Sequence, residues 1–418
     1  MSASSTQCVV VGGGPAGMVA ALLLARAGVS VTLLEKHADF LRDFRGDTVH
    51  PSTIALLDEL GLYREFTELP QLTRIERVRF PLADGRDLTV ADFTRLPLRH
   101  RYLAMAPQWD LLTLLARAGA REPTFELRMN HQVTGLRRDQ TGRVIGVHFR
   151  GPDGPGTLDA PLTLVCDGRW SESRNNAGLV ARDFPVGSDL WWFRLPVTGE
   201  IATNPIPVLR DGVLMGLIPR GDYVQAFRFI GKGSDAAMRA RGIEALRREI
   251  ANSIPALAES AATLASMDDV KLLDIRINRL RRWYVDGLLC IGDSAHAMSP
   301  AGGVGINLAI QDAVAAATIL AGPLLRGQVG VSDLAAVQRR RCWPAATVQT
   351  GQVLLHRRVL DRAAAGVGGR LRDALLPIPA FLLSHVPALS VVPAYAIGVG
   401  VRPEHAPDFA RRPAEPGP

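Results

Sequence analysis

The chain has 418 residues, which is too long for one compact core and predicts two or three domains. Its 47% hydrophobic and 21% charged residues are ordinary for a soluble globular protein. The net charge of +7 comes from arginines scattered among acidic residues without a basic run, which argues against nucleic-acid binding.

The amino terminus and the cysteines both indicate a reducing compartment. The first seven residues, MSASSTQ, have neither the basic nor the apolar region of a secretory signal peptide. The four cysteines, at 8, 166, 290 and 342, show no metal-like spacing, and we expect no metal site. We therefore expect a cytoplasmic protein.

A strand, a glycine-rich turn and a helix open the chain as CVVVGGGPAGMVAALLLARAG. We predict a buried parallel strand over residues 8–11, followed by G-x-G-x-x-G spacing at Gly12, Gly14 and Gly17. These glycines allow the tight turn, the approach of a pyrophosphate and close helix–strand packing, respectively. A second strand over 31–34 ends at Glu35, whose carboxylate can accept from ribose hydroxyls. The unit predicts that the protein binds an adenine dinucleotide.

Two later segments place an acid at the end of an apolar strand. In LTLVCDGRWSESR the strand 162–165 leads into Asp167, and in GLLCIGDSAHAMSPAGGVGINLAIQDA the strand 288–291 leads into Asp293. Open α/β sheets bind ligands at the carboxyl ends of their strands. Either segment alone is also compatible with an ordinary strand-to-helix connection, but both follow the opening motif in order.

Between and after these segments the patterns change. Residues 190–197 and 213–230 read as antiparallel strands with a turn at 220–222, and a helical stretch follows over 235–266. The apolar stretch 374–401 is interrupted by four prolines, so we expect short helices rather than a transmembrane span of about 20 residues. Residues 402–418 read as a frayed tail.

The segments GGGPAG, DGRWSESR and GDSAHAMSPAGGVG resemble the single-component flavoprotein aromatic hydroxylases of the para-hydroxybenzoate hydroxylase-like family, over residues 6–345. The resemblance implies an α/β fold with a Rossmann-like FAD-binding domain, a β-sheet substrate domain and a C-terminal helical segment. The expected boundaries are 1–180 with a β excursion over about 72–106, 181–275, 276–345 and 346–418.

The resemblance also implies FAD as cofactor and NADH or NADPH as transient reductant. The positions that it assigns to FAD are Gly12, Gly14, Pro15, Ala16, Gly17, Glu35, Lys36, Arg45, Gln108, Asp167, Gly168, Asp293, Gly305, Ile306 and Asn307. The last three would begin a helix whose positive end faces the flavin. Pro300, Gly302 and Gly303 would seat the flavin C4a-hydroperoxide as catalytic positions.

The substrate side is less defined. A sheet would roof the pocket, with Met215, Leu217, Gln225 and Phe227 as candidate substrate contacts. His50 and His100 are candidates for a base that deprotonates a phenol, although a single histidine is more often structural.

The implied activity is insertion of one oxygen atom from O2 into an aromatic or other electron-rich small molecule. Alternatives on the same fold are a Baeyer–Villiger or epoxidising oxygenase, and a reductase or dehydrogenase of a lipid-like or isoprenoid substrate. A non-enzymatic FAD-binding module is a further alternative. We expect a monomer or homodimer.

Overall fold

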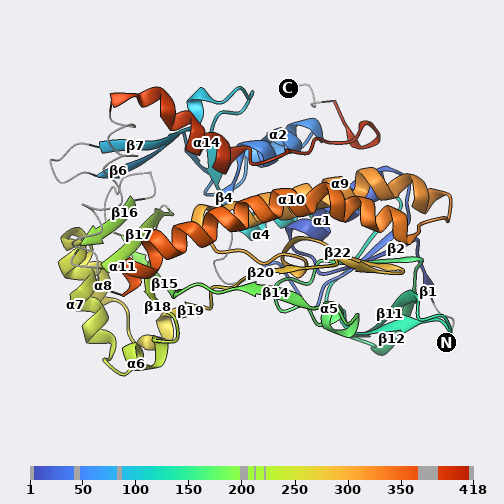
Figure 1. The fold of residues 1–418 in the computed structure, drawn as a ribbon, viewed down its shortest axis with the longest axis horizontal. Coiled ribbons are helices and arrows are strands. Elements are labelled where there is room, and N and C mark those ends of the chain that lie inside the picture. Colours follow the sequence, from blue (N-terminus) through green and yellow to red (C-terminus); the bar gives the residue numbers. More distant parts are fainter. Residues whose placement is uncertain are drawn as a thin grey trace.

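A six-stranded sheet is the centre of the fold (Figure 1). The computed structural model describes residues 4–41, 48–81, 87–197, 206–210, 213–220, 223–365 and 385–413. The strand order is β21 (Tyr284–Val285), β22 (Leu288–Cys290), β13 (Leu162–Val165), β2 (Cys8–Val11), β3 (Val31–Leu34) and β9 (Phe125–Arg128). All but β21 run parallel, so their carboxyl ends share one edge. The predicted strands 8–11, 31–34 and 162–165 are confirmed, and β22 ends one residue before the predicted 291.

The central sheet is covered on both faces, and every residue of β2, β3, β13 and β22 is buried. Cys8 and Val10 pack into a helical core with α1 (Pro15–Arg26), α4 (Gln108–Ala120) and α9 (Val304–Leu325). Val9 and Val11 pack instead against Val147 and its neighbours in a four-stranded sheet. That sheet has the order β1 (Ser4–Ser5), β12 (Gly154–Asp159), β11 (Val144–Gly151) and β10 (Gln132–Arg138).

A five-stranded antiparallel sheet forms the second body of the fold. Its order is β16 (Ile206–Arg210), β17 (Val213–Pro219), β18 (Tyr223–Gly231), β15 (Ser188–Pro196) and β19 (Lys271–Leu273). Phe193 and Ala226 face α7 (Ile243–Ser253) and form a core with its Leu246 and Ile250. The predicted antiparallel strands are confirmed, and the predicted helical stretch is divided into α6 (Asp235–Arg239), α7 and α8 (Ala258–Ala262).

Smaller elements surround these sheets. They are β4 (Thr48–Val49), α2 (Pro51–Glu59), α3 (Tyr63–Thr67), β5 (Thr73–Ile75), β6 (Arg77–Pro81), β7 (Asp87–Asp92), β8 (Leu103–Met105), α5 (Glu172–Asn176), β14 (Ala181–Phe184), β20 (Ile277–Leu280), α11 (Asp361–Ala364) and α14 (Val391–Gly398). From the C-terminal apolar stretch, α14 packs its Ala394 against Phe93 and Leu103.

Two long helices tie the bodies together. α9 packs against α1 and against α10 (Val331–Leu355), and Figure 1 shows α10 running from the central sheet to the five-stranded sheet. Among the described residues, one stretch, Ala301–Leu325, is long and apolar enough to cross a membrane. Within the fold it is a core helix, since 72% of its most apolar window is buried.

The frayed tail predicted for 402–418 is wrong over its described part. Arg341 of α10 is fully buried and donates to Asp312 of α9 at 3.0 Å, to Glu404 at 3.2 Å and to the Arg402 carbonyl at 3.0 Å. Hydrogen bonds to a charged side chain hold this segment in place. The segment has no long apolar run, and for this reason the sequence did not reveal that it packs on the body.

Replacing Asp312 tests the buried ion network. Asp312→Asn removes the carboxylate that faces the buried Arg341, and we expect the free energy of unfolding to fall by about 3–5 kcal/mol. The control Asp286→Asn breaks a half-exposed pair with Arg143 and should cost less than about 1 kcal/mol. Chemical denaturation of both variants measures the difference, and equal losses would contradict the assigned role of Asp312.

Candidate active site

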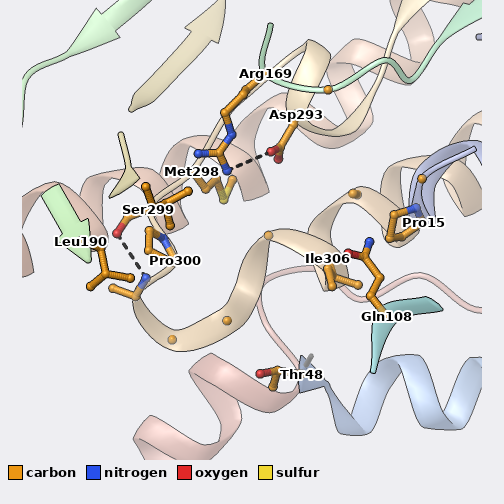
Figure 2. Close-up of a pocket in the computed structure, with 18 of the residues that line it drawn as sticks. Pro15, Thr48, Gln108, Arg169, Leu190, Asp293, Met298, Ser299, Pro300 and Ile306 are labelled. Carbon is orange, nitrogen blue, oxygen red and sulfur yellow. Dashed lines mark hydrogen bonds and ion pairs between the residues drawn. The ribbon is translucent and has the colours of Figure 1, made fainter. Parts of the chain in front are cut away.

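One cavity of about 1080 Å³ connects the central sheet with the five-stranded sheet. Gly12, Gly14 and Glu35 line one end, and Trp192 and Phe227 line the other. Figure 2 shows part of its wall, from Pro15 at the start of α1 to Leu190 on β15. The volume lies just above the usual range of ligand pockets, about 300–1,000 Å³, so a large ligand and a second molecule can share the cavity.

Two of the three motif glycines are required by the fold itself. Gly12 has φ +100°, and a Cβ there would lie 2.7 Å from the Cys166 carbonyl oxygen. A Cβ on Gly17 would lie 2.0 Å from the Gly12 carbonyl oxygen. Gly14 differs, because a Cβ there would meet no atom within 4 Å. Protein packing therefore explains Gly12 and Gly17 but not Gly14, which forms an open part of the cavity wall.

Glu35 holds the shape of this turn. Its side chain is buried, and its two carboxylate oxygens accept from the backbone N–H of Gly13 at 2.7 Å and of His37 at 3.0 Å. The end of β3 thereby fixes the turn between β2 and α1, as the strand–turn–helix–strand pattern requires.

Two acids lie at the carboxyl ends of β13 and β22. Burial raises the pKa of Asp167, although hydrogen bonds from Ser171 and Ser173 oppose this. Its Oδ2 accepts from the Ser173 N–H at 3.2 Å, whereas its buried Oδ1 has no partner among the described residues. Asp293 contacts Arg169 across the same wall, with 3.4 Å between carboxylate and guanidinium (Figure 2).

A tight turn leads from this wall into α9. Gly302 and Gly303 have φ of +81° and +63°, a left-handed conformation that favours glycine. His50 donates from Nε2 to the Gly303 carbonyl at 2.9 Å, and its burial lowers its pKa. α9 begins at Val304, so the unsatisfied N–H groups of its first turn lie at the cavity.

Residues 5–350 match the family model described as FAD binding domain. The chain is 35% identical over 388 residues to 6-methylpretetramide 4-monooxygenase of Streptomyces rimosus, covering 92% of this chain and 90% of that protein. The chain belongs to this family of FAD-dependent monooxygenases.

Further similarities agree in class and fold. Anhydrotetracycline monooxygenase of S. rimosus is 30% identical over 323 residues. The match covers 73% of this chain and 60% of that protein. The solved anhydrotetracycline hydroxylase OxyS of S. rimosus superimposes with a TM-score of 0.75 at 24% identity, covering 94% of this chain and 76% of that one. The predicted α/β fold, the FAD cofactor and the monooxygenase class are confirmed, and the reductase alternative has no support.

The cavity fits FAD on two independent observations. Gly14 leaves open space where a pyrophosphate would approach, and Asp167 presents a buried carboxylate oxygen that has no donor in the described part of the chain. An unsatisfied buried acceptor is costly, so a ligand hydroxyl or N–H is its natural partner.

Most positions assigned to the FAD monooxygenase pattern lie on the cavity wall. Those lining it are Gly12, Gly14, Pro15, Ala16, Glu35, Lys36, Gln108, Asp167, Gly168, Asp293, Pro300, Gly302, Gly303, Gly305 and Ile306. Gly17 does not line it, since it packs α1 on β2. Asn307 does not either, because its Oδ1 accepts from Ser52 and Thr53 at 2.8 and 2.7 Å. Arg45 lies outside the described residues.

The expected substrate contacts are only partly at the cavity. Met215 and Phe227 line it, but Leu217 and Gln225 do not. Leu217 belongs to the core that α7 covers, and the Gln225 amide donates to the Phe193 carbonyl at 2.8 Å. The candidate bases His50 and His100 do not line the cavity, and His100 contacts Asp58 at 2.9 Å.

Sequence reasoning missed much of the apolar wall. It comprises Ile75, Val78, Phe93, Leu103, Leu190, Trp192, Leu214, Ile218, Phe229, Val359, Leu360, Ala363 and Ile397. Trp192 stacks on Phe227 with 5.5 Å between ring centroids and 12° between planes. The adjacent tryptophans 191 and 192 could have indicated this wall. Neighbouring residues of a strand point to opposite faces of the sheet, so when Trp191 packs toward the helices, Trp192 faces the cavity.

Substituting Gly14 separates ligand binding from folding. Gly14→Val places a side chain in open cavity space, so we expect native circular dichroism but an FAD affinity reduced about tenfold or more (about 1.4 kcal/mol). Gly12→Ala is the contrasting variant, because its positive φ and close contact should destabilise the fold by about 1–3 kcal/mol. Flavin titration and thermal unfolding test both, and unchanged FAD affinity in Gly14→Val would refute the assigned cradle.

Proposed function

We propose that this FAD-dependent monooxygenase hydroxylates a fused-ring phenol, with NADH or NADPH as reductant. The observation that carries the proposal is the continuous cavity, which extends from the glycine turn at Gly14 to the stacked pair Trp192 and Phe227. Flat aromatic walls suit a flat aromatic ligand, because offset stacking adds to the burial of apolar area.

The cavity and the relatives support a large substrate. Two S. rimosus relatives are named for 6-methylpretetramide and anhydrotetracycline, and a 25% identical Pseudomonas relative for para-nitrophenol. The 35% identical relative covers nearly the whole chain, and the cavity is large. We therefore extend the fused-ring class, rather than the single-ring class, to this protein.

FAD, when bound and reduced, would supply the activated oxygen. The first turn of α9, at Gly305 and Ile306, directs N–H groups and a partial positive charge into the cavity, where negative charge on the reduced flavin would be stabilised. Gly302 and Gly303 have no side chains, so the adjoining turn leaves the cavity open beside them. Pro300 restricts the backbone of this turn. The apolar wall opposite excludes water.

The cysteines support a reducing compartment for this protein. Cys8, Cys166 and Cys290 are unpaired thiols, and burial raises their pKa, that of Cys8 to about 12. Thiols that stay protonated are weakly reactive. This is compatible with the reducing cytoplasm that we propose, and the oligomeric state remains a prediction of monomer or homodimer.

An oxygen electrode tests the proposed substrate class. With FAD-loaded protein and either NADH or NADPH, we expect a fused-ring phenol such as alizarin to stimulate oxygen uptake more than para-nitrophenol does. The physical reason is the larger apolar area that the fused rings bury, about 25 cal/mol per Å². Stimulation by para-nitrophenol alone would contradict the fused-ring class, and nicotinamide oxidation without phenol consumption would contradict hydroxylation.

Asp293→Ala tests the strand-end carboxylate. We expect the Asp293 carboxylate of the wild type to hold the ribityl hydroxyls of FAD through charge-assisted hydrogen bonds worth about 1.5–3 kcal/mol each. The variant should lose FAD, or retain it misplaced and divert reducing equivalents to hydrogen peroxide. FAD content and the ratio of product to oxidised nicotinamide measure this, and wild-type values for both would make Asp293 only a contact for Arg169.

A further inference from the structure

We propose that Ser299, His356, Ser188 and Asp361 form a proton relay that carries the hydroxyl proton of the substrate from the cavity to solvent. The inference rests on the proposed function, since it supplies the base that a phenol substrate needs. Ser299 lines the cavity next to Pro300, whereas the other three lie behind the wall.

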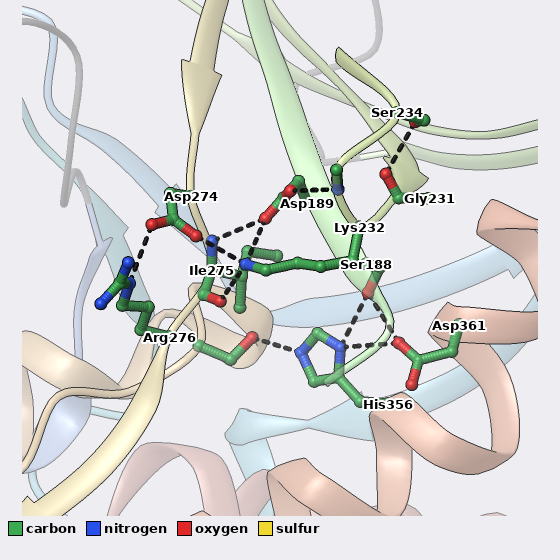
Figure 3. Close-up of polar contacts among 12 residues, drawn as sticks. Ser188, Asp189, Gly231, Lys232, Ser234, Asp274, Ile275, Arg276, His356 and Asp361 are labelled. Atoms are coloured by element: carbon green, nitrogen blue, oxygen red, sulfur yellow. Dashed lines mark hydrogen bonds and ion pairs between the residues drawn. The ribbon is translucent and has the colours of Figure 1, made fainter. Parts of the chain in front are cut away.

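The four side chains form an unbroken hydrogen-bonded chain, and Figure 3 shows its part from His356 through Ser188 to Asp361. Ser299 Oγ lies 2.7 Å from His356 Nε2, and His356 Nδ1 lies 2.9 Å from Ser188 Oγ. Ser188 Oγ lies 2.8 Å from Asp361 Oδ1, which is itself 3.4 Å from His356 Nδ1. Ser188 and His356 are fully buried, whereas the Asp361 side chain is 20% exposed. The chain therefore begins at the cavity and ends at solvent.

The donors in this chain point in one direction. An ionised Asp361 only accepts, so the Ser188 hydroxyl donates to it. Ser188 Oγ must then accept from His356, which places the proton of the neutral ring on Nδ1. His356 Nε2 is left as an acceptor, and the Ser299 hydroxyl donates to it. Each link is thus set to pass a proton from Ser299 toward Asp361.

Helix α10 positions this chain against the active-site turn. Gln352 accepts from the Ser299 N–H at 3.1 Å and donates to the carbonyls of Ser299 and Ala301, both at 2.9 Å. His356 lies four residues later and so on the same face of the helix. The helix then changes to a π turn, His356–Leu360. A π turn brings residues five apart together, which places Asp361 beside His356, and such turns are frequent at functional sites.

The surroundings keep His356 neutral and therefore able to accept a proton. Burial lowers its pKa, Asp361 opposes this, and the positive charge of Lys232 lowers it further. The edge of Phe229, from the cavity wall, packs against the ring at 6.4 Å between centroids. Lys232 is held away by Asp189 and Asp274, each at 2.6 Å, so it does not interrupt the chain (Figure 3).

The step is a proton transfer without any change in oxidation state. The phenol O–H bond breaks and its proton moves to Ser299 Oγ, while the Ser299 proton moves to His356 Nε2. His356 then passes its Nδ1 proton to Ser188, whose own proton moves to Asp361 and on to solvent. The substrate is left as a phenolate, which is the more electron-rich form for hydroxylation.

Ser188 distinguishes a relay from a merely structural contact. Gln352 and His50 hold the backbone of the turn, whereas the Ser188 side chain bonds to His356 and Asp361 and does not line the cavity. Ser188→Ala therefore removes the two short links of the chain, leaves only the 3.4 Å contact of His356 Nδ1 with Asp361, and keeps the wall intact. Ser390→Ala is the matched control, since Ser390 is equally buried and its side-chain bond among the described residues is local, to the Pro387 carbonyl.

The first measurement is the tautomer of His356 in the FAD-loaded protein. Nitrogen-15 NMR of histidine-labelled protein, with His356→Gln to identify the signals, should show a neutral ring protonated on Nδ1 at pH 7. If the proton were on Nε2, His356 would donate to Ser299 and could not accept its proton, which would overturn the relay.

The second measurement is the ionisation of bound alizarin, whose colour changes when it loses a proton. After a rapid rise in pH, we expect alizarin bound to the wild type and to Ser390→Ala to lose its proton about tenfold or more faster than alizarin bound to Ser188→Ala, because a relay changes the rate of proton transfer. Product formation by Ser188→Ala should fall about 100-fold near neutral pH and recover as the pH rises through the pKa of the phenol. FAD content should stay unchanged in both variants.

The outcomes separate the relay from the proposed substrate class. Equal rates of alizarin ionisation on the wild type and Ser188→Ala would overturn the relay, even if hydroxylation is observed. If alizarin does not bind, the fused-ring class fails, and the tautomer alone decides: an Nδ1 proton supports the relay and an Nε2 proton overturns it.

Discussion

A single buried carboxylate, that of Asp312, joins the parts on which the site depends. It accepts from the Gly292 N–H at 3.0 Å, contacts the His296 ring and pairs with Arg341 of α10. Burial opposes its ionisation, but the charges and hydrogen bonds of His296 and Arg341 outweigh burial and lower its pKa. The late motif, α9 and α10 are therefore held in one arrangement by charge as well as by packing.

This arrangement explains how one helix can serve both ends of the cavity. α10 is fixed to α9 through Arg341, and eleven residues later its Gln352 holds the turn that contains Ser299. The same helix ends beside the five-stranded sheet, where Leu360 lines the apolar wall. The dinucleotide end and the substrate end are thereby held in a fixed relation, which a reaction between a bound cofactor and a bound substrate requires.

The elements with strong local signals were predictable from sequence. The glycine turn and short strands with at most one polar residue, a threonine, predicted β2, β3 and β13 with their correct bounds, because a parallel strand buried on both faces is almost entirely apolar. The resemblance then supplied the FAD class. Gly14 could be assigned to the ligand rather than to packing only when the neighbours of each glycine were known.

The features that sequence did not reveal depend on contacts between distant segments. Ser299 and His356 lie 57 positions apart, and a π turn that no pattern announces brings Asp361 beside His356. Gln225 was expected at the cavity because it alternates with Phe227, but a backbone carbonyl of the neighbouring strand satisfies its amide. The segment after residue 402 lacks apolar periodicity and is held by Glu404, whose partners lie on α10.

The most direct test of the account follows the oxygen atom. FAD-loaded protein is supplied with NADPH or NADH, alizarin and ¹⁸O2, and the product is analysed by mass spectrometry. The account predicts one labelled oxygen atom on the aromatic product and the second in water. Unlabelled product, or product formed at the same rate without oxygen, would contradict a monooxygenase acting in this cavity.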